Sequence, residues 1–257
     1  AKCSSYDWER GLGTCHNCNT TFQLHTYKRK GEAAREYVKP EQPDPEYPGI
    51  EFGIGDRIVE WFKTRGISQK TLYDLQIAEG PEFMPQTGKA ENTIKFNYFM
   101  GGELINIKYR DGRKNFKLFK GAEKVFYNID SIVGYDTCVI VEGEMDVLAY
   151  HEAGITNVIS VPNGATLNHN NLDYLDNCID YFEDKEKVIL AVDQDEAGVA
   201  LQNELIRRLG AEVCYLTNFV DCKDANDYLL KYGKEELAKT IKDCRLFHLK
   251  TLQHLKI

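Results

Sequence analysis

Acidic residues follow two apolar runs in the second half of the chain. Glu142 comes directly after TCVIV, and Asp193 and Asp195 follow KVILAV. In an extended chain, residues i and i+2 point to the same side, so both aspartates can face one ligand. Carboxylates, together with water and substrate phosphates, are the ligands that Mg²⁺ prefers. These three acids therefore predict a divalent-metal site for phosphodiester chemistry.

Acids in these positions also have a purely structural interpretation. Asp195 or Glu196 can stabilise the helix that follows, because the N-terminal end of a helix carries partial positive charge. For one acid alone the two interpretations are balanced. Two such motifs on neighbouring strand–helix units favour the metal site.

Alternating strands and helices are expected to position these acids. Apolar runs predict buried strands within 137–141, 157–161, 187–192 and 211–219, and helical patterns lie between them. This order indicates βαβ units and a mostly parallel sheet. Ligands of such sheets bind beyond the carboxyl ends of the strands, where the acids stand. The glycine after the second motif, Gly198, is expected to allow tight packing at the start of its helix.

A smaller α+β region is expected before this sheet. Helical patterns cover 56–66 and 68–80, with Ser68 as N-cap of the second. Strand-like runs at 93–100 and 103–110 are joined by Gly101-Gly102, which predicts a hairpin.

A basic segment at 106–124 continues from this hairpin. Its seven basic residues oppose two acids in a chain with a net charge of −8. Such segregation indicates a phosphate-binding surface, and the interleaved aromatic rings would stack on bases or pack inward. A solvated hairpin face is the alternative. The basic residues are Lys108, Arg110, Arg113, Lys114, Lys117, Lys120 and Lys124.

Composition is that of a globular protein. The 257 residues are 42% hydrophobic and 28% charged, and no run reaches the ~18 apolar residues of a membrane span. The N-terminus lacks a signal-peptide pattern, so we expect no membrane partner and a cytoplasmic location, that of the host if a phage encodes the chain. Five scattered cysteines fit reduced thiols: Cys138, Cys178, Cys214, Cys222 and Cys244.

The E-G and D-x-D motifs resemble the toprim fold of topoisomerases and primases. The matching residues are Glu142-Gly143 and Asp193-Gln194-Asp195. The resemblance implies that Asp193 and Asp195 hold Mg²⁺ or Mn²⁺ and that Glu142 is a ligand or a general acid/base. Glu144 and Asp146 would be auxiliary residues.

The order of motifs is similar to the primase half of phage and mitochondrial-type primase–helicases. RGIS, K-x-R-x-x-x-K-N-F-K, E-G-E-x-D, D-x-D-E-A-G and C-K-D-A-N-D follow one another over nearly all of 50–230. The resemblance implies that basic residues contact the incoming triphosphate or the primer, and that K-D-A-N-D adjoins the metal. A turn with an N-capping aspartate is the alternative for that last motif. The residues concerned are Lys108, Arg110, Lys114, Lys117, Lys223, Asp224 and Asp227.

Cys15 and Cys18 form a single C-x-x-C pair, whereas a zinc ribbon needs two. The segment resembles the second half of a primase zinc-binding domain. Zn²⁺ is expected only if another cysteine pair lies upstream of Ala1, and an unliganded pair is the alternative.

These observations predict an α/β protein with a toprim domain, preceded by a basic α+β domain and part of a zinc ribbon. The expected parts are a partial zinc-binding domain at 1–25, a linker at 26–50, an N-terminal polymerase subdomain at 51–134, the toprim domain at 135–230 and a helical linker at 231–257.

The predicted function is that of a DNA primase, a DNA-directed RNA polymerase of DNA replication. Its partners would be single-stranded DNA, ribonucleoside triphosphates, the RNA primer and a helicase domain in cis or in trans. The alternative is an inactive primase-like module that binds single-stranded DNA and supports helicase assembly. A toprim nuclease or topoisomerase fits less well, because the basic region and the length argue against them. The chain has no G-x-x-x-x-G-K-[ST] loop of its own.

Overall fold

The chain divides into two compact units, Ala1–Lys39 and Pro40–Ile257. The computed structural model describes residues 40–43, 53–165 and 172–247, and in the first unit the backbone of three strands. These strands, β1 (Ser4–Asp7), β2 (Leu12–Cys15) and β3 (Thr21–Gln23), pair antiparallel in that order. Cys15 ends β2, and Cys18 lies outside the described residues, so the zinc half-site remains a prediction.

Two short helices open the larger unit. They are α1 (Asp56–Thr64) and α2 (Gln69–Asp74), and Gly66 between them has φ +74°. The Ser68 hydroxyl caps α2 by accepting the Thr71 N–H, as the sequence predicts. The predicted helix over 68–80 is wrong beyond Asp74, because Gln76 has φ +52° and the chain becomes extended from Ala78.

An antiparallel sheet follows, in the order β4-β5-β6-β7. The strands are β4 (Ala78–Met84), β5 (Lys89–Met100), β6 (Glu103–Asp111) and β7 (Phe116–Leu118). The predicted hairpin is confirmed: Met100 pairs with Glu103, and both turn glycines have positive φ, which suits a tight hairpin turn. Pro81 is tolerated because β4 is an edge strand.

The second sheet has the order β12-β11-β10-β8-β9. The strands β8 (Thr137–Val141), β9 (Val158–Ser160), β10 (Lys187–Leu190) and β11 (Cys214–Leu216) run parallel, and β12 (Arg245–Leu246) is antiparallel. The predicted α/β fold with a mostly parallel sheet is confirmed. Strands β8 to β10 are almost wholly buried, as expected when helices cover both faces.

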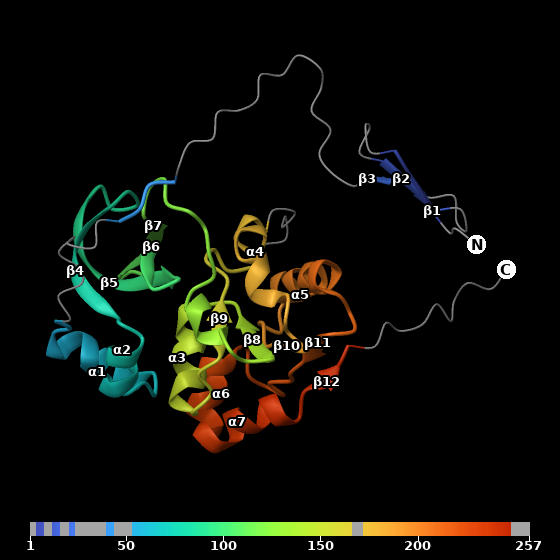
Figure 1. The fold of residues 1–257 in the computed structure, drawn as a ribbon. Helices are drawn as coiled ribbons and strands as arrows, with labels where there is room; N and C mark the ends of the chain where they lie inside the picture. Colours follow the sequence, from blue (N-terminus) through green and yellow to red (C-terminus); the bar gives the residue numbers. More distant parts are fainter. Residues whose placement is uncertain are drawn as a thin grey trace, which may run out of the picture. The chain divides into compact units, whose positions relative to one another are not determined.

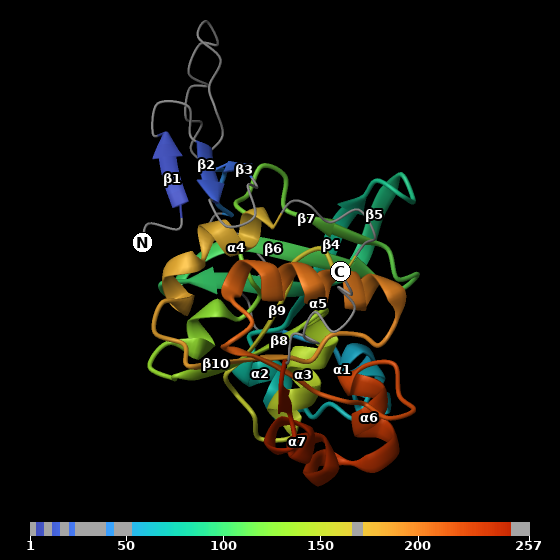
Figure 2. The same ribbon diagram turned by 90° about the vertical axis from the view of Figure 1, so that its right-hand side faces the viewer.

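Helices cover this sheet on its two faces (Figures 1 and 2). In Figure 1, α3 (Glu144–Glu152), α6 (Ala225–Tyr232) and α7 (Lys234–Lys242) lie together below it, and α4 (Asp173–Asn177) and α5 (Glu196–Leu209) lie above it. Two 3₁₀ helices complete the unit, Ile129–Ile132 and Ile179–Phe182. Residues 234–246, expected in a linker, form α7 and β12, and Leu237 of α7 is fully buried in the core.

One hydrophobic core joins the two sheets of the larger unit. Phe96 and Tyr98 of β5 contact Tyr127 edge-on, with ring centroids 6.1 and 5.1 Å apart. Tyr127 forms an isolated bridge with Ser160 of β9. The relative position of the two sheets is therefore fixed by packing.

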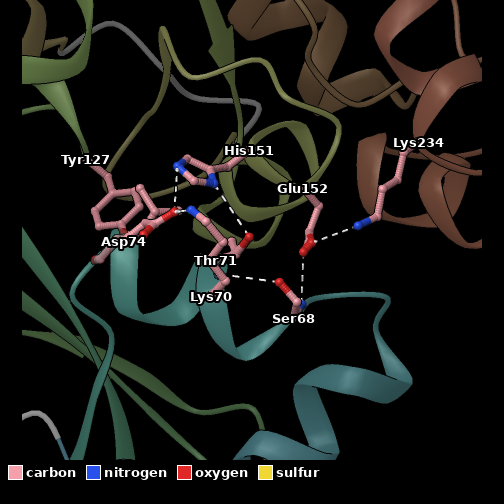
Figure 3. Close-up of polar contacts among 9 residues, drawn as sticks. Ser68, Lys70, Thr71, Asp74, Tyr127, His151, Glu152 and Lys234 are labelled. Atoms are coloured by element: carbon pink, nitrogen blue, oxygen red, sulfur yellow. Dashed lines mark hydrogen bonds and ion pairs between the residues drawn. The ribbon is translucent and has the colours of Figure 1, made fainter.

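Polar contacts tie α2 to the C-terminal end of α3 (Figure 3). The Glu152 carboxylate accepts the Ser68 N–H at 3.1 Å and lies 3.3 Å from Lys234 Nζ. One helical position earlier, His151 Nδ1 is 3.5 Å from Thr71 Oγ1. The C-terminal end of α3 is thus tied to α2 and to the first residue of α7.

Within the described residues, no helix is long and apolar enough to cross a membrane. Among the described residues, the five scattered cysteines are unpaired, and four of them are buried.

Candidate active site

Two parallel strands bring the acids to one edge of the sheet. Glu142 follows β8, and Asp193 lies just beyond β10, which pairs directly with β8. The Asp193 N–H donates to Glu142 Oε1 at 3.1 Å. Lys223 Nζ lies 3.0 Å from Asp193 Oδ2 and 3.3 Å from Asp195 Oδ2, so both aspartates face the same ammonium group.

The start of α5 packs directly against these acids. A Cβ atom on Gly198 would lie 2.1 Å from the Asp193 carbonyl oxygen and 2.5 Å from Glu142 Oε1. Real Cβ atoms essentially never come that close. Glycine at this position therefore permits the close approach that the sequence predicts.

Burial is the main cause of raised pKa values at three of these acids. Burial, aided by the Asp193 charge, raises the pKa of Glu142 to about 7. Burial and the charges of Asp224 and Asp193 raise the pKa of Asp146 well above its usual range. Burial also raises the pKa of Asp193, although Lys223 opposes this shift. The cluster is thus short of positive charge.

Three helices start around the cluster. Gly143 precedes α3, Asp195 caps α5 by accepting the Gly198 N–H at 3.0 Å, and Asp224 caps α6 by accepting the Asp227 N–H at 2.8 Å. Asp195 and Asp224 are therefore helix caps, as the structural interpretation of these acids predicts. Asp195 also contacts Lys223. The positive ends of the three helices favour negative charge here.

A cleft of about 710 Å³ lies between the acids and the antiparallel sheet. Glu142, Asp146, Asp193 and Asp224 line it from the parallel sheet and its helices. The opposite side is lined by α1 and its C-terminal residue and by β5 to β7 with their turn, and this side is basic and aromatic. It includes Trp61, Arg65, Lys108, Arg110, Lys114, Phe116 and Lys117.

The turn between β6 and β7 presents Lys114 to this cleft. Lys114 has φ +67°, and the Asp111 carboxylate organises the turn by accepting the N–H groups of Arg113 and Asn115 at 2.9 and 2.8 Å. Sequence reasoning missed this role of Asp111. The turn-forming letters D-G-R-K-N are the signal that would have indicated it.

Lys108 has a different environment from the one expected of a triphosphate ligand. Its ammonium lies 2.9 and 3.0 Å from the two oxygens of Glu144, and the Tyr98 hydroxyl donates to Glu144 Oε1 at 2.5 Å. All three residues are buried. Glu144, expected as an auxiliary of the metal site, is therefore engaged by Lys108 and Tyr98.

Two other basic residues of the segment also have protein partners. Lys117 Nζ lies 2.7 Å from Glu82 Oε1, and Arg110 Cζ lies 4.5 Å from the centre of the Trp61 ring.

Asn226 belongs to the K-D-A-N-D motif, but its individual contacts were not predicted from the sequence. Its N–H donates to Asp146 Oδ1 at 3.1 Å, and its Nδ2 donates to the Arg65 carbonyl at 2.9 Å. The K-D-A-N-D segment thereby ties the acid cluster to the end of α1.

Comparisons with known proteins agree with this architecture. Residues 139–229 match the sequence model of a family described as Toprim-like. The chain carries a toprim-like domain. The toprim resemblance of the E-G and D-x-D motifs is thus confirmed, and the parallel sheet with its acids belongs to the toprim-like domain.

Relatives of the toprim-like chain include primase homologues. It is 35% identical over 213 residues to the primase homolog protein of Arabidopsis thaliana, covering 76% of this chain and 61% of the relative. It is 34% identical, again over 76% of its length, to the Twinkle homolog protein, chloroplastic/mitochondrial, of the same plant, of which it spans 29%. The chain thus spans less than two thirds of either relative, and its resemblance to toprim primases is confirmed.

Solved structures share the fold. The primase fragment of the bacteriophage T7 primase-helicase protein superposes with a TM-score of 0.62 at 22% identity and covers 91% of each chain. The RNA polymerase domain of Mycobacterium tuberculosis primase DnaG, in complex with double-stranded DNA, reaches 0.60 at 16% identity over 75% of this chain and 74% of that one. At these identities the likeness concerns the fold alone.

Proposed function

We propose that this chain is the catalytic core of a DNA primase that makes short RNA primers on single-stranded DNA. One observation carries the proposal: buried acids at two strand ends and basic side chains from a second sheet line the same cleft. The acids suit a divalent metal ion, and the basic side chains suit a triphosphate. The names of the sequence relatives support the same activity.

Mg²⁺ or Mn²⁺ would be held by Glu142, Asp193 and Asp195, with Asp146 and Asp224 beside them. The donors fit because they are carboxylates: burial raises the pKa of Glu142 and of Asp193, and one cationic group, Lys223 Nζ, already contacts both Asp193 and Asp195. Among the described residues, no three acidic, histidine or cysteine side chains are grouped as a metal site. Because Lys223 Nζ contacts both aspartates, it would be displaced from them when a cation binds. A bound metal ion would polarise the phosphate and lower the pKa of the attacking hydroxyl.

The residues of this chain divide the remaining work. The 3′-hydroxyl oxygen of one nucleotide bonds to the α-phosphorus of the next, the bond to pyrophosphate breaks, and pyrophosphate leaves. Glu142, whose carboxylate accepts the Asp193 N–H, would serve as a ligand of the metal or as the general base that takes the hydroxyl proton. Lys114, Lys117 and Arg110 would hold the triphosphate, and Lys223, once displaced from the aspartates, would hold the leaving pyrophosphate.

The expected partners are single-stranded DNA, ribonucleoside triphosphates and the RNA primer. A helicase domain in cis or in trans is supported by the name of the T7 protein, a primase-helicase. Zn²⁺ would require a second cysteine pair. A solved primase structure from Aquifex aeolicus comprises a zinc-binding domain and an RNA polymerase domain, which supports a zinc-binding part beside a polymerase core.

The test is RNA synthesis on single-stranded DNA with labelled ribonucleotides and Mg²⁺. We expect wild type and the control Glu183→Gln, an exposed acid, to make short RNA. Glu142→Gln should reduce the rate at least 100-fold, in the range of lost acid/base catalysis. Equal synthesis by Glu142→Gln would overturn the site. DNA binding without synthesis, even with a complete zinc domain restored, would favour the inactive assembly module.

A further inference from the structure

A turn that follows β9 lies beside Glu142 at the edge of the parallel sheet. Strand β8, which Glu142 follows, pairs with β9 on one side and with β10 on the other. Just beyond β9, the Val161 N–H donates to the Val141 carbonyl at 3.2 Å and so continues the pairing of the two strands. Residues 162–164 come next. They therefore lie next to Glu142, on the side away from Asp193.

This turn contributes a side-chain amide to the lining of the catalytic cleft. Its residues are Pro162, Asn163 and Gly164, and all three line the cleft. Pro162 is buried, Asn163 is exposed, and Gly164 has φ +65°, which glycine adopts without strain. The N–H of the next residue, Ala165, donates to the Glu142 carboxylate. The turn is thus held beside Glu142 at both of its ends.

Asn163 differs in chemistry from the other polar groups of the cleft. Most of these groups are charged: the acids suit a metal ion, and the basic side chains suit a triphosphate. Of the two side-chain amides in the lining, Asn226 is buried and donates to the Arg65 carbonyl, whereas Asn163 is exposed. An amide donates and accepts hydrogen bonds without carrying charge, so it suits a hydroxyl group.

We propose that Asn163 recognises the 2′-hydroxyl of the nucleotide whose 3′-hydroxyl attacks. The inference rests on the proposed function and adds a contact to the sugar. In that reaction Glu142 acts at the 3′-hydroxyl, as a metal ligand or as the base, and the 2′-hydroxyl is on the neighbouring carbon of the ribose. The amide beside Glu142 is therefore placed to pair with the group that distinguishes RNA from DNA. The chain extends an RNA end in preference to a DNA end.

The test compares two primer ends at the binding step. A labelled RNA primer that ends in ribose or in 2′-deoxyribose is annealed to a DNA template, and fluorescence anisotropy measures its affinity for the full chain with Mg²⁺ but without nucleoside triphosphate. Wild type should bind the ribose end about threefold to tenfold more tightly, the range of one hydrogen bond. Asn163→Ala should bind both ends as wild type binds the deoxyribose end. Asn203→Ala, at an exposed position of α5 outside the cleft lining, is the control and should keep the wild-type ratio.

Primer extension gives a second readout. With ribonucleoside triphosphates added, wild type should extend the ribose end faster, and Asn163→Ala should reduce this preference at least about threefold. Equal affinity of wild type for both ends, an unchanged ratio in Asn163→Ala, or an equal loss on both ends would overturn the proposal, because a purely structural role of the turn does not depend on the sugar. A binding preference for the ribose end without any synthesis would count against the proposed function alone.

Discussion

The two aspartates of the D-x-D motif differ in environment although they face one ammonium group. Asp193 is 12% exposed and burial raises its pKa, whereas Asp195 is 47% exposed and the Gly198 N–H lowers its pKa. Lys223, from a distant segment, contacts both. The spacing of the motif predicts that both side chains point the same way. Their different exposure and opposite pKa shifts depend on contacts with other residues, which the spacing does not show.

Glu142 should reduce stability in the absence of metal. Its pKa is about 7 in the folded chain against an ordinary value of 4.5, so the folded state binds more protons between these values. The contribution of Glu142 to the free energy of unfolding therefore falls as the pH rises from about 4.5 to about 7. In EDTA at pH 8, Glu142→Gln should raise the Tm by a few degrees, since a repelling charge is removed. Thermal unfolding followed by circular dichroism measures this, with Glu183→Gln as control; an unchanged or lower Tm for Glu142→Gln would contradict it.

Helix α3 is fixed at both ends, and its C-terminal anchor is testable. Burial acts to raise the pKa of Glu152, but hydrogen bonds from Ser68 and Lys234 outweigh it and the pKa is lowered. A carboxylate with a lowered pKa stabilises the fold above its ordinary pKa, and this contribution is lost as the pH falls through the folded value.

Glu152→Gln should therefore lower the free energy of unfolding by about 2 kcal/mol at pH 7. The difference from wild type should shrink as the pH falls below about 4, near the ordinary value for glutamate. Urea unfolding at several pH values measures it, with Glu183→Gln as the matched change at an exposed site. A difference that stays constant down to pH 3 would show that the charge of Glu152 is not involved.

Elements with local signals were predictable, and elements set by distant contacts were not. The Gly101-Gly102 pair predicted the hairpin, and the apolar runs predicted the parallel strands. Strand β4 was missed because its edge pairing with β5 outweighs the helical pattern around it. In the site, the acids followed from their place after strands, whereas Trp61 and Tyr98 are ordinary core aromatics by pattern and gain their roles only through Arg110 and Glu144.

At the scale of the whole larger unit, the cleft depends on how the two sheets are held together. Lys108 of β6 and Tyr98 of β5 both contact Glu144, which lies two residues after Glu142. This buried contact joins the basic strands to the first turn of α3. It therefore sets the distance between the basic residues and the acids.

Removing one partner of this ion pair should cost more than removing both. Lys108→Met leaves the Glu144 carboxylate buried without its cation and should lower the free energy of unfolding by about 3–5 kcal/mol. Lys108→Met/Glu144→Gln should recover at least about 1 kcal/mol of that loss, because no uncompensated charge remains. Urea unfolding of the single and double variants measures the coupling. Purely additive losses would show that the ion pair does not link the sheets.

The most direct measurement of the central claim is templated nucleotide incorporation by the acid cluster. Wild type and the exposed-site control Asp184→Asn should release one pyrophosphate for each ribonucleotide joined, and only nucleotides complementary to the DNA should be joined. Asp193→Asn should bind the same DNA and lose at least 100-fold in rate, because it removes charge at the position where phosphate charge must be neutralised. Wild-type rates of templated synthesis by Asp193→Asn would contradict the assignment of this cluster as the catalytic centre.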